Sequence, residues 1–199
     1  MPKPVVILDL DDTISPFAQP FLDWYQEKYN HKLPKPKPHY SFTEAFGNPA
    51  EGNWVDIIDD YHASAPFDDI KPKKDAIEVL SRLADKFTFH IITSRPNVHR
   101  EVTEEYIKEY LADYVSQLHM PTETNILANQ TNKAELAESL NAVALVDDGV
   151  HNINDLEGYD IKPILYKPKH HHWGNMDVSD KATIVEDWDG VEEEQLKLL

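Results

Sequence analysis

The chain contains no cysteine, few basic residues and no long apolar run. Without cysteine it can form neither a disulfide framework nor a thiolate metal site, and it has no thiol nucleophile. Its 19 basic residues face 36 acidic ones, and the resulting formal charge of −17 argues against a general nucleic-acid binder. No apolar run approaches the roughly 18 residues of a membrane span. We therefore expect a soluble cytoplasmic protein that binds neither membranes nor nucleic-acid polymers.

The 199 residues, 41% of them hydrophobic, suffice for one domain or for one domain that carries an insertion. Short apolar runs without polar alternation, which are typical of strands buried on both faces of a parallel sheet, cover residues 5–8, 89–92, 143–146 and 161–166. Helical spacing of apolar residues predicts helices over residues 73–86, 98–114 and 132–140. This alternation indicates an α/β fold with a Rossmann-like, doubly wound parallel sheet.

One stretch, residues 16–70, breaks the alternation. It is rich in aromatic residues, and helical spacing recurs near residues 21–25 and 54–58. We interpret it as a small helical cap inserted after the first strand, so that residues 1–15 and 71–199 form the α/β core. The alternative is that its aromatic side chains only form a small hydrophobic core within the insertion and have no role in binding.

Three polar stretches are interpreted as solvated surface. The chain becomes acidic after about Asp177, which predicts a solvated tail or edge. The basic, proline-rich residues 32–37 are expected to be a stiff linker. His170, His171 and His172 are adjacent and would point in different directions on any regular element, so a loop is favoured over a metal site.

Carboxylates follow two of the predicted strands. In open α/β sheets, sites form at the carboxyl ends of the strands. Asp9 and Asp11 stand at i and i+2 and face the same way in an extended segment, so Asp9 can be a nucleophile and Asp11 a proton donor and acceptor. Asp147 and Asp148 follow the third run, and up to four carboxylates would converge. Their repulsion requires a cation or large pKa shifts, and all-oxygen ligands favour Mg²⁺.

Phosphate-binding groups complete this constellation. Thr93 and Ser94 follow the second run, and their hydroxyls can bond to phosphate oxygens. Lys133 stands at the start of a predicted helix, from which it can reach an anion near the strand ends. Each feature alone is compatible with a turn, a helix cap or a solvated side chain. The ordered combination is more specific.

That combination resembles, in order, the four motifs of the haloacid dehalogenase (HAD) superfamily of phosphotransferases, over roughly residues 5 to 150. The resemblance implies that Asp9 forms an aspartyl-phosphate, that Asp11 is the general acid and base, and that Thr93 and Lys133 hold phosphate. It also implies Mg²⁺ binding by Asp147 with Asp148, by Asp9, and by the backbone carbonyl of Asp11. The expected activity is that of a phosphomonoesterase acting on a small-molecule phosphate ester.

Within the superfamily, the chain resembles the 5′(3′)-deoxyribonucleotidases, which have a small helical cap with aromatic side chains at matching places. The matching residues are Phe17, Tyr40-Ser41-Phe42 and Phe46-Gly47. The resemblance implies a nucleoside monophosphate substrate, with Phe17, Tyr40 and Phe42 as specificity residues that stack on the base. Two positions depart from the pattern: Arg95 follows Ser94, and Gly149 stands where the mammalian-type enzymes carry an arginine. Arg95 is a candidate for compensating by binding phosphate.

Three alternatives stay open at this point. The same scaffold serves phosphatases of other small esters, such as sugar phosphates. A non-catalytic phospho-receiver combines similar residues, but it would place its acceptor aspartate after a middle strand, whereas here that strand ends in Thr93. A degenerate HAD scaffold used only for binding is opposed by the presence of all four motifs.

Overall fold

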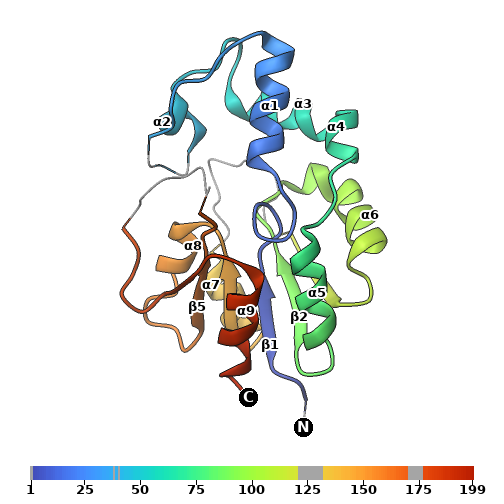
Figure 1. Cartoon of the computed structure of the whole chain (residues 1–199), viewed down its shortest axis with the longest axis vertical. Helices are drawn as coiled ribbons and strands as arrows, with labels where there is room; N and C mark the ends of the chain where they lie inside the picture. The colour runs from blue at the N-terminus through green and yellow to red at the C-terminus, as the bar shows by residue number, and fades with distance from the viewer. Residues whose placement is uncertain (1, 38, 40, 121–131, 170–176) are drawn as a thin grey trace.

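The computed structural model describes residues 2–37, 39, 41–120, 132–169 and 177–199 (Figure 1). In this part of the chain, the strands are β1 (Val5–Leu8), β2 (Thr88–Ile92), β3 (Val115–His119), β4 (Ala142–Asp147), β5 (Lys162–Tyr166) and β6 (Thr183–Val185). They form one parallel sheet in the order β3-β2-β1-β4-β5-β6. The α/β fold with a doubly wound parallel sheet is therefore confirmed.

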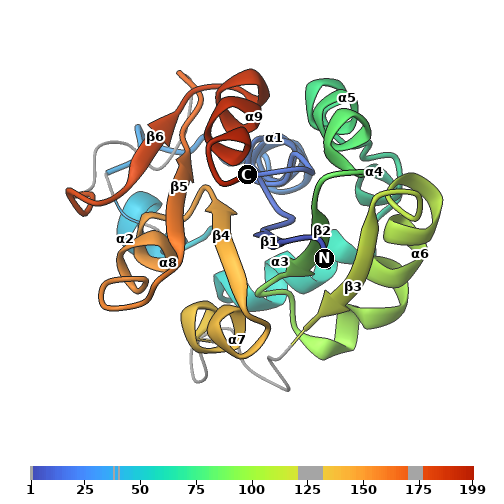
Figure 2. The same ribbon diagram turned by 90° about the horizontal axis from the view of Figure 1, so that it is seen from below.

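Helices cover both faces of this sheet. They are α5 (Lys74–Leu83), the short η1 (Asn97–His99), α6 (Arg100–Tyr110), α7 (Lys133–Ser139), α8 (Val150–Asn154) and α9 (Trp188–Leu196). Successive residues of β1 point to opposite faces: Val6 and Leu8 pack with α5, α6 and α9, whereas Ile7 packs with α7 and α8. Figure 2 shows α5 and α9 on one side of the sheet and α7 on the other. Burial on both faces explains why β1 is a continuous apolar run.

The segment between β1 and α5, residues 16–70, which we call the insert, has an apolar cluster of its own. Its helices are α1 (Ala18–Tyr29), α2 (Phe42–Phe46), α3 (Trp54–His62) and α4 (Ala65–Asp68). The cluster includes Phe21, Tyr25, Trp54 and Tyr61, which are all nearly or fully buried. In Figure 1 the insert lies beyond the end of the sheet opposite the N-terminus, which is the end where β1 stops.

The C-terminal segment differs from the expected solvated tail. Residues from Thr183 onward form β6 and α9, and the side chain of Trp188 is completely buried. Its Nε1 donates a 3.3 Å hydrogen bond to the backbone oxygen of Thr13, directly after β1. The segment is therefore packed and not a tail, whereas the alternative expectation of an edge agrees with β6, the last strand of the sheet.

The edge strand β3 also was not expected. The helix predicted over residues 98–114 ends at Tyr110, and the next residues turn into β3. Its residues are half-buried or exposed, so it lacks the apolar run that identifies the central strands. None of the helices in the described ranges is both long and apolar enough to cross a bilayer.

Candidate active site

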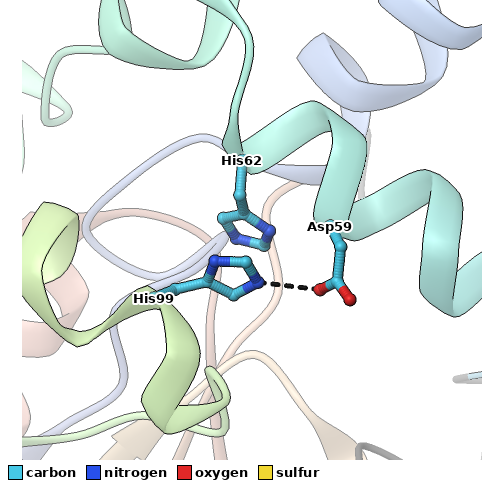
Figure 3. A group of neighbouring side chains, drawn as sticks. All are labelled: Asp59, His62 and His99. Carbon is cyan, nitrogen blue, oxygen red and sulfur yellow. Dashed lines mark hydrogen bonds and ion pairs between the residues drawn. The ribbon is translucent and has the colours of Figure 1, made fainter.

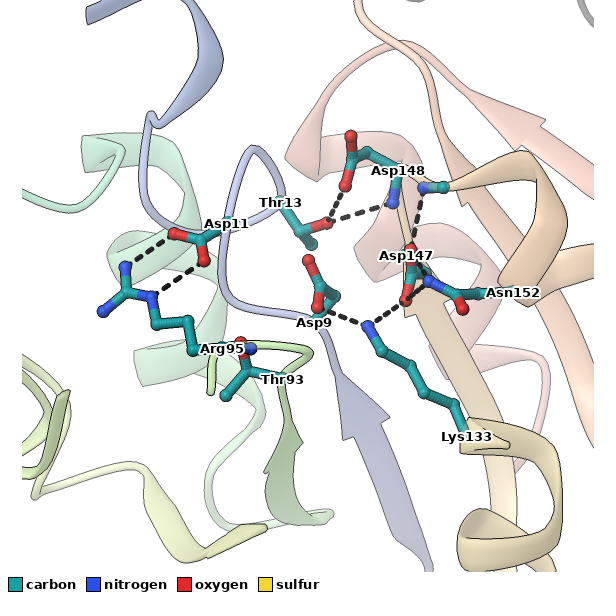
Figure 4. Close-up of polar contacts among 10 residues, drawn as sticks. Asp9, Asp11, Thr13, Thr93, Arg95, Lys133, Asp147, Asp148 and Asn152 are labelled. Atoms are coloured by element: carbon teal, nitrogen blue, oxygen red, sulfur yellow. Dashed lines mark hydrogen bonds and ion pairs between the residues drawn. The ribbon is translucent and has the colours of Figure 1, made fainter. Parts of the chain in front are cut away.

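The pairing of β1 with β4 brings two of the predicted aspartates together. Leu8 pairs with Val146, and the backbone N–H of Asp9 donates a 2.9 Å hydrogen bond to the Val146 oxygen. Asp9 and Asp147 consequently leave adjacent parallel strands at the same edge of the sheet (Figure 4). Both side chains are buried, with 6% and 1% exposure, as expected from their place after apolar strands.

Lys133 lies between these two carboxylates. It is the first residue of α7, and Asn132 caps that helix by accepting from the backbone N–H groups of Ala134 and Glu135. Its Nζ donates to Asp9 Oδ1 and, at 2.6 Å, to Asp147 Oδ2. Burial disfavours the ammonium charge, but the two carboxylates outweigh this effect and raise the pKa of Lys133. The lysine therefore stays charged inside the site.

Burial has the opposite consequence for Asp9. Desolvation raises the pKa of Asp9 well above its usual range, Lys133 lowers it, and the neighbouring Asp147 raises it further. The Asp9 carboxylate thus depends on nearby positive charge to stay ionised.

The acidic pair at the end of β4 is fixed by three neighbouring groups. Asn152 Nδ2 donates to both carboxylate oxygens of Asp147 at 3.0 Å, and Gly149 N donates to Oδ1 at 2.7 Å. A Cβ at position 149 would lie 2.9 Å from that oxygen, so glycine permits the contact. Thr13 Oγ1 accepts from Asp148 N at 3.1 Å and donates to its Oδ1 at 3.4 Å. Neither Asn152 nor Thr13 was predicted to belong to the site. Both stand close to its aspartates in the sequence, since Thr13 follows Asp9 by four residues and Asn152 follows Asp148 by four.

One carboxylate oxygen from each of Asp9, Asp147 and Asp148 lies within 4.8 Å of the other two. With Lys133 among them, three negative charges face one positive charge, which leaves an excess of two negative charges. An all-oxygen set with this excess fits a hard divalent cation. Three of the four aspartates expected to converge do so. A contribution of Asp11 through its backbone carbonyl stays a prediction.

The side chain of Asp11 is turned away from this group, toward Arg95 (Figure 4). Arg95 donates from Nε to Asp11 Oδ2 at 2.8 Å and from Nη2 to Oδ1 at 2.6 Å. The guanidinium is buried, lies 5.1 Å from the ring centre of Phe67, and also donates from Nη1 to Thr103 Oγ1 at 3.2 Å. Burial opposes its charge, and Asp11 raises the pKa of Arg95. The structure thus pairs Arg95 with the carboxylate expected to transfer protons, while phosphate binding by Arg95 stays a prediction.

The second motif follows β2 as expected. Thr93 is buried, and its Oγ1 accepts from the backbone N–H of Arg95 at 3.3 Å, whereas Ser94 is exposed. Phosphate binding by these two hydroxyls stays a prediction.

The aromatic residues expected to set specificity fall into three cases. Phe17 is half-buried, and its ring centre lies 5.4 Å from that of His62. Phe42 packs inside the insert, 5.1 Å from Phe21 and 5.5 Å from Trp54, which agrees with a role in the small hydrophobic core of the insert. Tyr40 lies outside the described residues, as do His170 to His172.

The loop after β1 ties the two ends of the insert together. The Asp12 carboxylate, in a residue with φ of 60°, accepts from Phe17 N and Ala18 N at the start of α1. Lys73, just before α5, donates from Nζ to the backbone oxygen of Asp12. Its backbone N–H donates to the backbone oxygen of Ile14 at 2.8 Å. Burial and the charge of Asp148 raise the pKa of Asp12 to about 7. Both connections of the insert are therefore fixed beside the acidic site.

Adjacent parallel strands thus bring Asp9 and Asp147 to a common lysine. Solved structures with a similar fold are described as HAD-superfamily hydrolases. A haloacid dehalogenase-like hydrolase from Streptococcus pneumoniae matches with a TM-score of 0.63 and 11% identity, covering 98% of both chains. YfnB from Bacillus subtilis, a HAD-hydrolase by description and solved with bound magnesium, matches with a TM-score of 0.63 and 11% identity. That alignment covers 98% of this chain and 99% of YfnB.

Residues 3–194 match the family described as "5' nucleotidase, deoxy (Pyrimidine), cytosolic type C protein" (NT5C). The chain belongs to this family and is a phosphoric monoester hydrolase of the HAD superfamily. No curated protein matches the sequence significantly.

Proposed function

We propose that this hydrolase is a Mg²⁺-dependent nucleoside monophosphate phosphatase of the 5′(3′)-deoxyribonucleotidase type, which forms an aspartyl-phosphate on Asp9. The observation that carries the proposal is the position of the Asp9 carboxylate at the end of β1, where it shares the Lys133 ammonium with Asp147 and lies within 4.8 Å of Asp147 and Asp148. A buried carboxylate beside a fixed ammonium group is suited to attack an anionic phosphoryl group, because the ammonium offsets the repulsion.

The residues divide the chemistry in two steps. Asp9 forms a bond to phosphorus while the bond from phosphorus to the leaving oxygen breaks. For this step Asp11 leaves its pair with Arg95, turns toward the site in the protonated form and gives its proton to the leaving oxygen. Water then attacks the phosphorus of the aspartyl-phosphate, Asp11 takes a proton from this water, and the P–O bond to Asp9 breaks. Phosphate leaves, and both aspartates return to their starting states. Thr93, Ser94 and Lys133 hold the phosphoryl oxygens.

Asp9, Asp147 and Asp148 would hold the magnesium ion, and Asn152 and Thr13 orient two of these carboxylates. When bound, Mg²⁺ supplies positive charge that stabilises the transferring phosphoryl group. Its size and charge match the all-oxygen set and its excess of two negative charges.

The insert acts as the cap in this proposal. Residues 16–70 would cover the site, exclude water and select the leaving group, with residues 1–15 and 71–199 as the catalytic core. Phe17 is half-buried and lies five residues beyond Asp12 in the loop that enters the cap, so it is available to a nucleobase. Stacking on such a ring contributes about 1–3 kcal/mol per base in single-strand binders.

The test compares wild type with Asp9→Asn on nucleoside 5′- and 3′-monophosphates, sugar phosphates and a generic aryl phosphate. We expect Asp9→Asn to retain the fold, as judged by circular dichroism, and to lose turnover. Asp113→Asn, at an exposed position after α6, is the matched control and should keep wild-type rates. Chelation should abolish activity, and added Mg²⁺ should restore it.

Two results would contradict parts of this proposal separately. If the Asp9→Asn variant hydrolysed these esters at the wild-type rate, the assignment of Asp9 as the nucleophile would be wrong. A preference for sugar phosphates over every nucleotide would replace the nucleotidase assignment and leave the phosphatase chemistry in place.

A further inference from the structure

A second group of potential metal ligands lies apart from the three aspartates, where the insert meets the core. Asp59 and His62 stand at i and i+3 on α3, and His99 is the last residue of η1, which follows β2 (Figure 3). One ligand atom from each of these residues lies within 4.8 Å of the other two. The rings of His62 and His99 stack with centres 4.1 Å apart.

His62 has an unused lone pair, on the nitrogen that lies over the His99 ring (Figure 3). Its Nδ1 lies 2.9 Å from the backbone oxygen of Ile58, and because a carbonyl only accepts, Nδ1 carries the proton. The residue is 5% exposed, and burial lowers the pKa of His62 to about 4, so the ring is neutral at pH 7. Its Nε2 is therefore an acceptor, and it is buried without a hydrogen-bond partner. An orphaned acceptor of this kind costs free energy unless something binds it.

The Ile58 contact is also the arrangement found around metal-ligating histidines. Such a ring usually donates its second N–H to a backbone carbonyl, which fixes the tautomer and leaves the other nitrogen for the ion. His62 has this orientation already. His99 Nε2 lies 2.8 Å from Asp59 Oδ1, so the Asp59 carboxylate lies beside the His99 ring. The Asp59 side chain is 43% exposed, which leaves a path from solvent.

We propose that Asp59, His62 and His99 form a site for a zinc-class transition-metal ion, with water as a fourth ligand. Two imidazole nitrogens and one carboxylate oxygen are a set typical of Zn²⁺ and unlike the oxygen ligands that Mg²⁺ prefers. A tetrahedral ion with bonds of about 2.0–2.2 Å holds its ligand atoms about 3.4 Å apart. The ligand atoms here lie within 4.8 Å of one another, and the stacked rings of His62 and His99 must rotate out of their stack to point at one ion. Without the ion, His99 Nε2 donates its proton to Asp59 Oδ1. The ion displaces that proton from Nε2, and the neutral His99 ring then carries its proton on Nδ1.

An ion here joins two parts of the fold. It links α3 of the insert to η1 of the core, and it does so beside Arg95. Thr103 Oγ1 donates to the His99 oxygen at 2.8 Å and accepts from Arg95 Nη1 at 3.2 Å. Metal binding thus restrains the insert next to the Arg95–Asp11 pair, and it does not depend on which phosphate ester the enzyme hydrolyses.

The test is a Zn²⁺ titration of chelator-stripped full-length protein, with millimolar Mg²⁺ present to occupy the all-oxygen site. Competition with a chromophoric chelator gives affinity and stoichiometry, and X-ray absorption at the zinc edge identifies ligands. We expect one tight site with two nitrogen ligands and a rise in Tm of about 5 °C or more at 100-fold excess over Kd. His62→Gln and His99→Gln should each lose this site, and Asp59→Asn should weaken it.

Replacement of His170, His171 and His172 by glutamine is the matched control, because that run is the other obvious zinc ligand in the sequence. This variant should keep the tight site and the Tm shift. The proposal is overturned if His62→Gln and His99→Gln bind zinc as tightly as wild type. It is equally overturned if wild type takes up no tightly bound zinc, or if the ligands of the bound zinc are oxygens alone.

Discussion

Arg95 holds both carboxylate oxygens of Asp11, through hydrogen bonds of 2.8 Å from Nε and 2.6 Å from Nη2. Bidentate pairs of this kind fix orientation as well as charge. In the proposed chemistry, Asp11 must meet the leaving oxygen and later a water molecule. The arginine therefore holds Asp11 in a defined orientation, turned away from Asp9 (Figure 4). If Arg95 binds phosphate as predicted, the substrate competes with Asp11 for the same guanidinium.

Arg95→Met is expected to lower kcat/KM at least tenfold, because Asp11 loses the group that orients it. Breaking a buried ion pair should also cost about 3 kcal/mol of unfolding free energy. Urea denaturation and steady-state kinetics measure the two effects. Lys74→Met removes an exposed i,i+4 pair with Glu78 and should change neither quantity appreciably. Wild-type kinetics in Arg95→Met would refute the positioning role.

Lys133→Met should be destabilised and nearly inactive. The variant leaves the buried Asp9 and Asp147 carboxylates without their shared ammonium, and such a loss typically costs about 3–5 kcal/mol. Because the remaining negative charges attract a divalent ion, Mg²⁺ should raise the Tm of this variant more than that of wild type. Lys108→Met, at an exposed position on α6, is the control. An equal response of both proteins to Mg²⁺ would contradict the proposed metal position.

Asn152→Ala tests the orientation of the acidic pair. Its amide donates to both oxygens of Asp147, so its removal should weaken Mg²⁺ activation by about 10- to 100-fold. The measurement is the Mg²⁺ concentration that gives half-maximal activity. Asn154→Ala, on the same helix but bonded to the Asp177 oxygen, should leave that concentration unchanged. If both variants respond alike, Asn152 does not act through Asp147.

The free energy of unfolding should decrease as the pH falls, because His62 is buried in its neutral form. Burial lowers the pKa of His62 to about 4, whereas the unfolded chain binds this proton near pH 6.5. The contribution is therefore complete above pH 6.5 and is lost as the pH falls toward 4. In chelator, wild type should lose about 2 kcal/mol more than His62→Gln between pH 7 and pH 5. Urea denaturation at both pH values measures this difference, and parallel losses would refute it.

The sequence predicted the central strands and their terminal residues because β1, β2 and β4 are buried on both faces and therefore form apolar runs. Strand β3 has half-buried and exposed residues and β6 has only three, so neither shows such a run. Asp9 and Asp147 could be placed together because strand order and direction follow from general rules of α/β folds.

The orientation of the side chains could not be predicted from the sequence. Asp11 faces Arg95 because the chain after Thr93 brings a guanidinium to it, which no spacing in the sequence reveals. The meeting of His62 with His99 depends on how α3 lies against η1, and this is set by packing between distant segments. Such contacts arise only when the tertiary structure forms.

The anchoring of the insert has a consequence for how this enzyme can change. Lys73, just after the insert, donates from its backbone N–H to the backbone oxygen of Ile14 and from its Nζ to the backbone oxygen of Asp12, both just before the insert. Because hydrogen bonds of Lys73 join the start and the end of the insert, we expect that the insert can be replaced without moving the strand ends that carry Asp9 and Asp147. In the proposed function, where the insert is the cap, replacing it with the corresponding segment of a relative is expected to change substrate choice and to leave Asp9 and Asp147 in place.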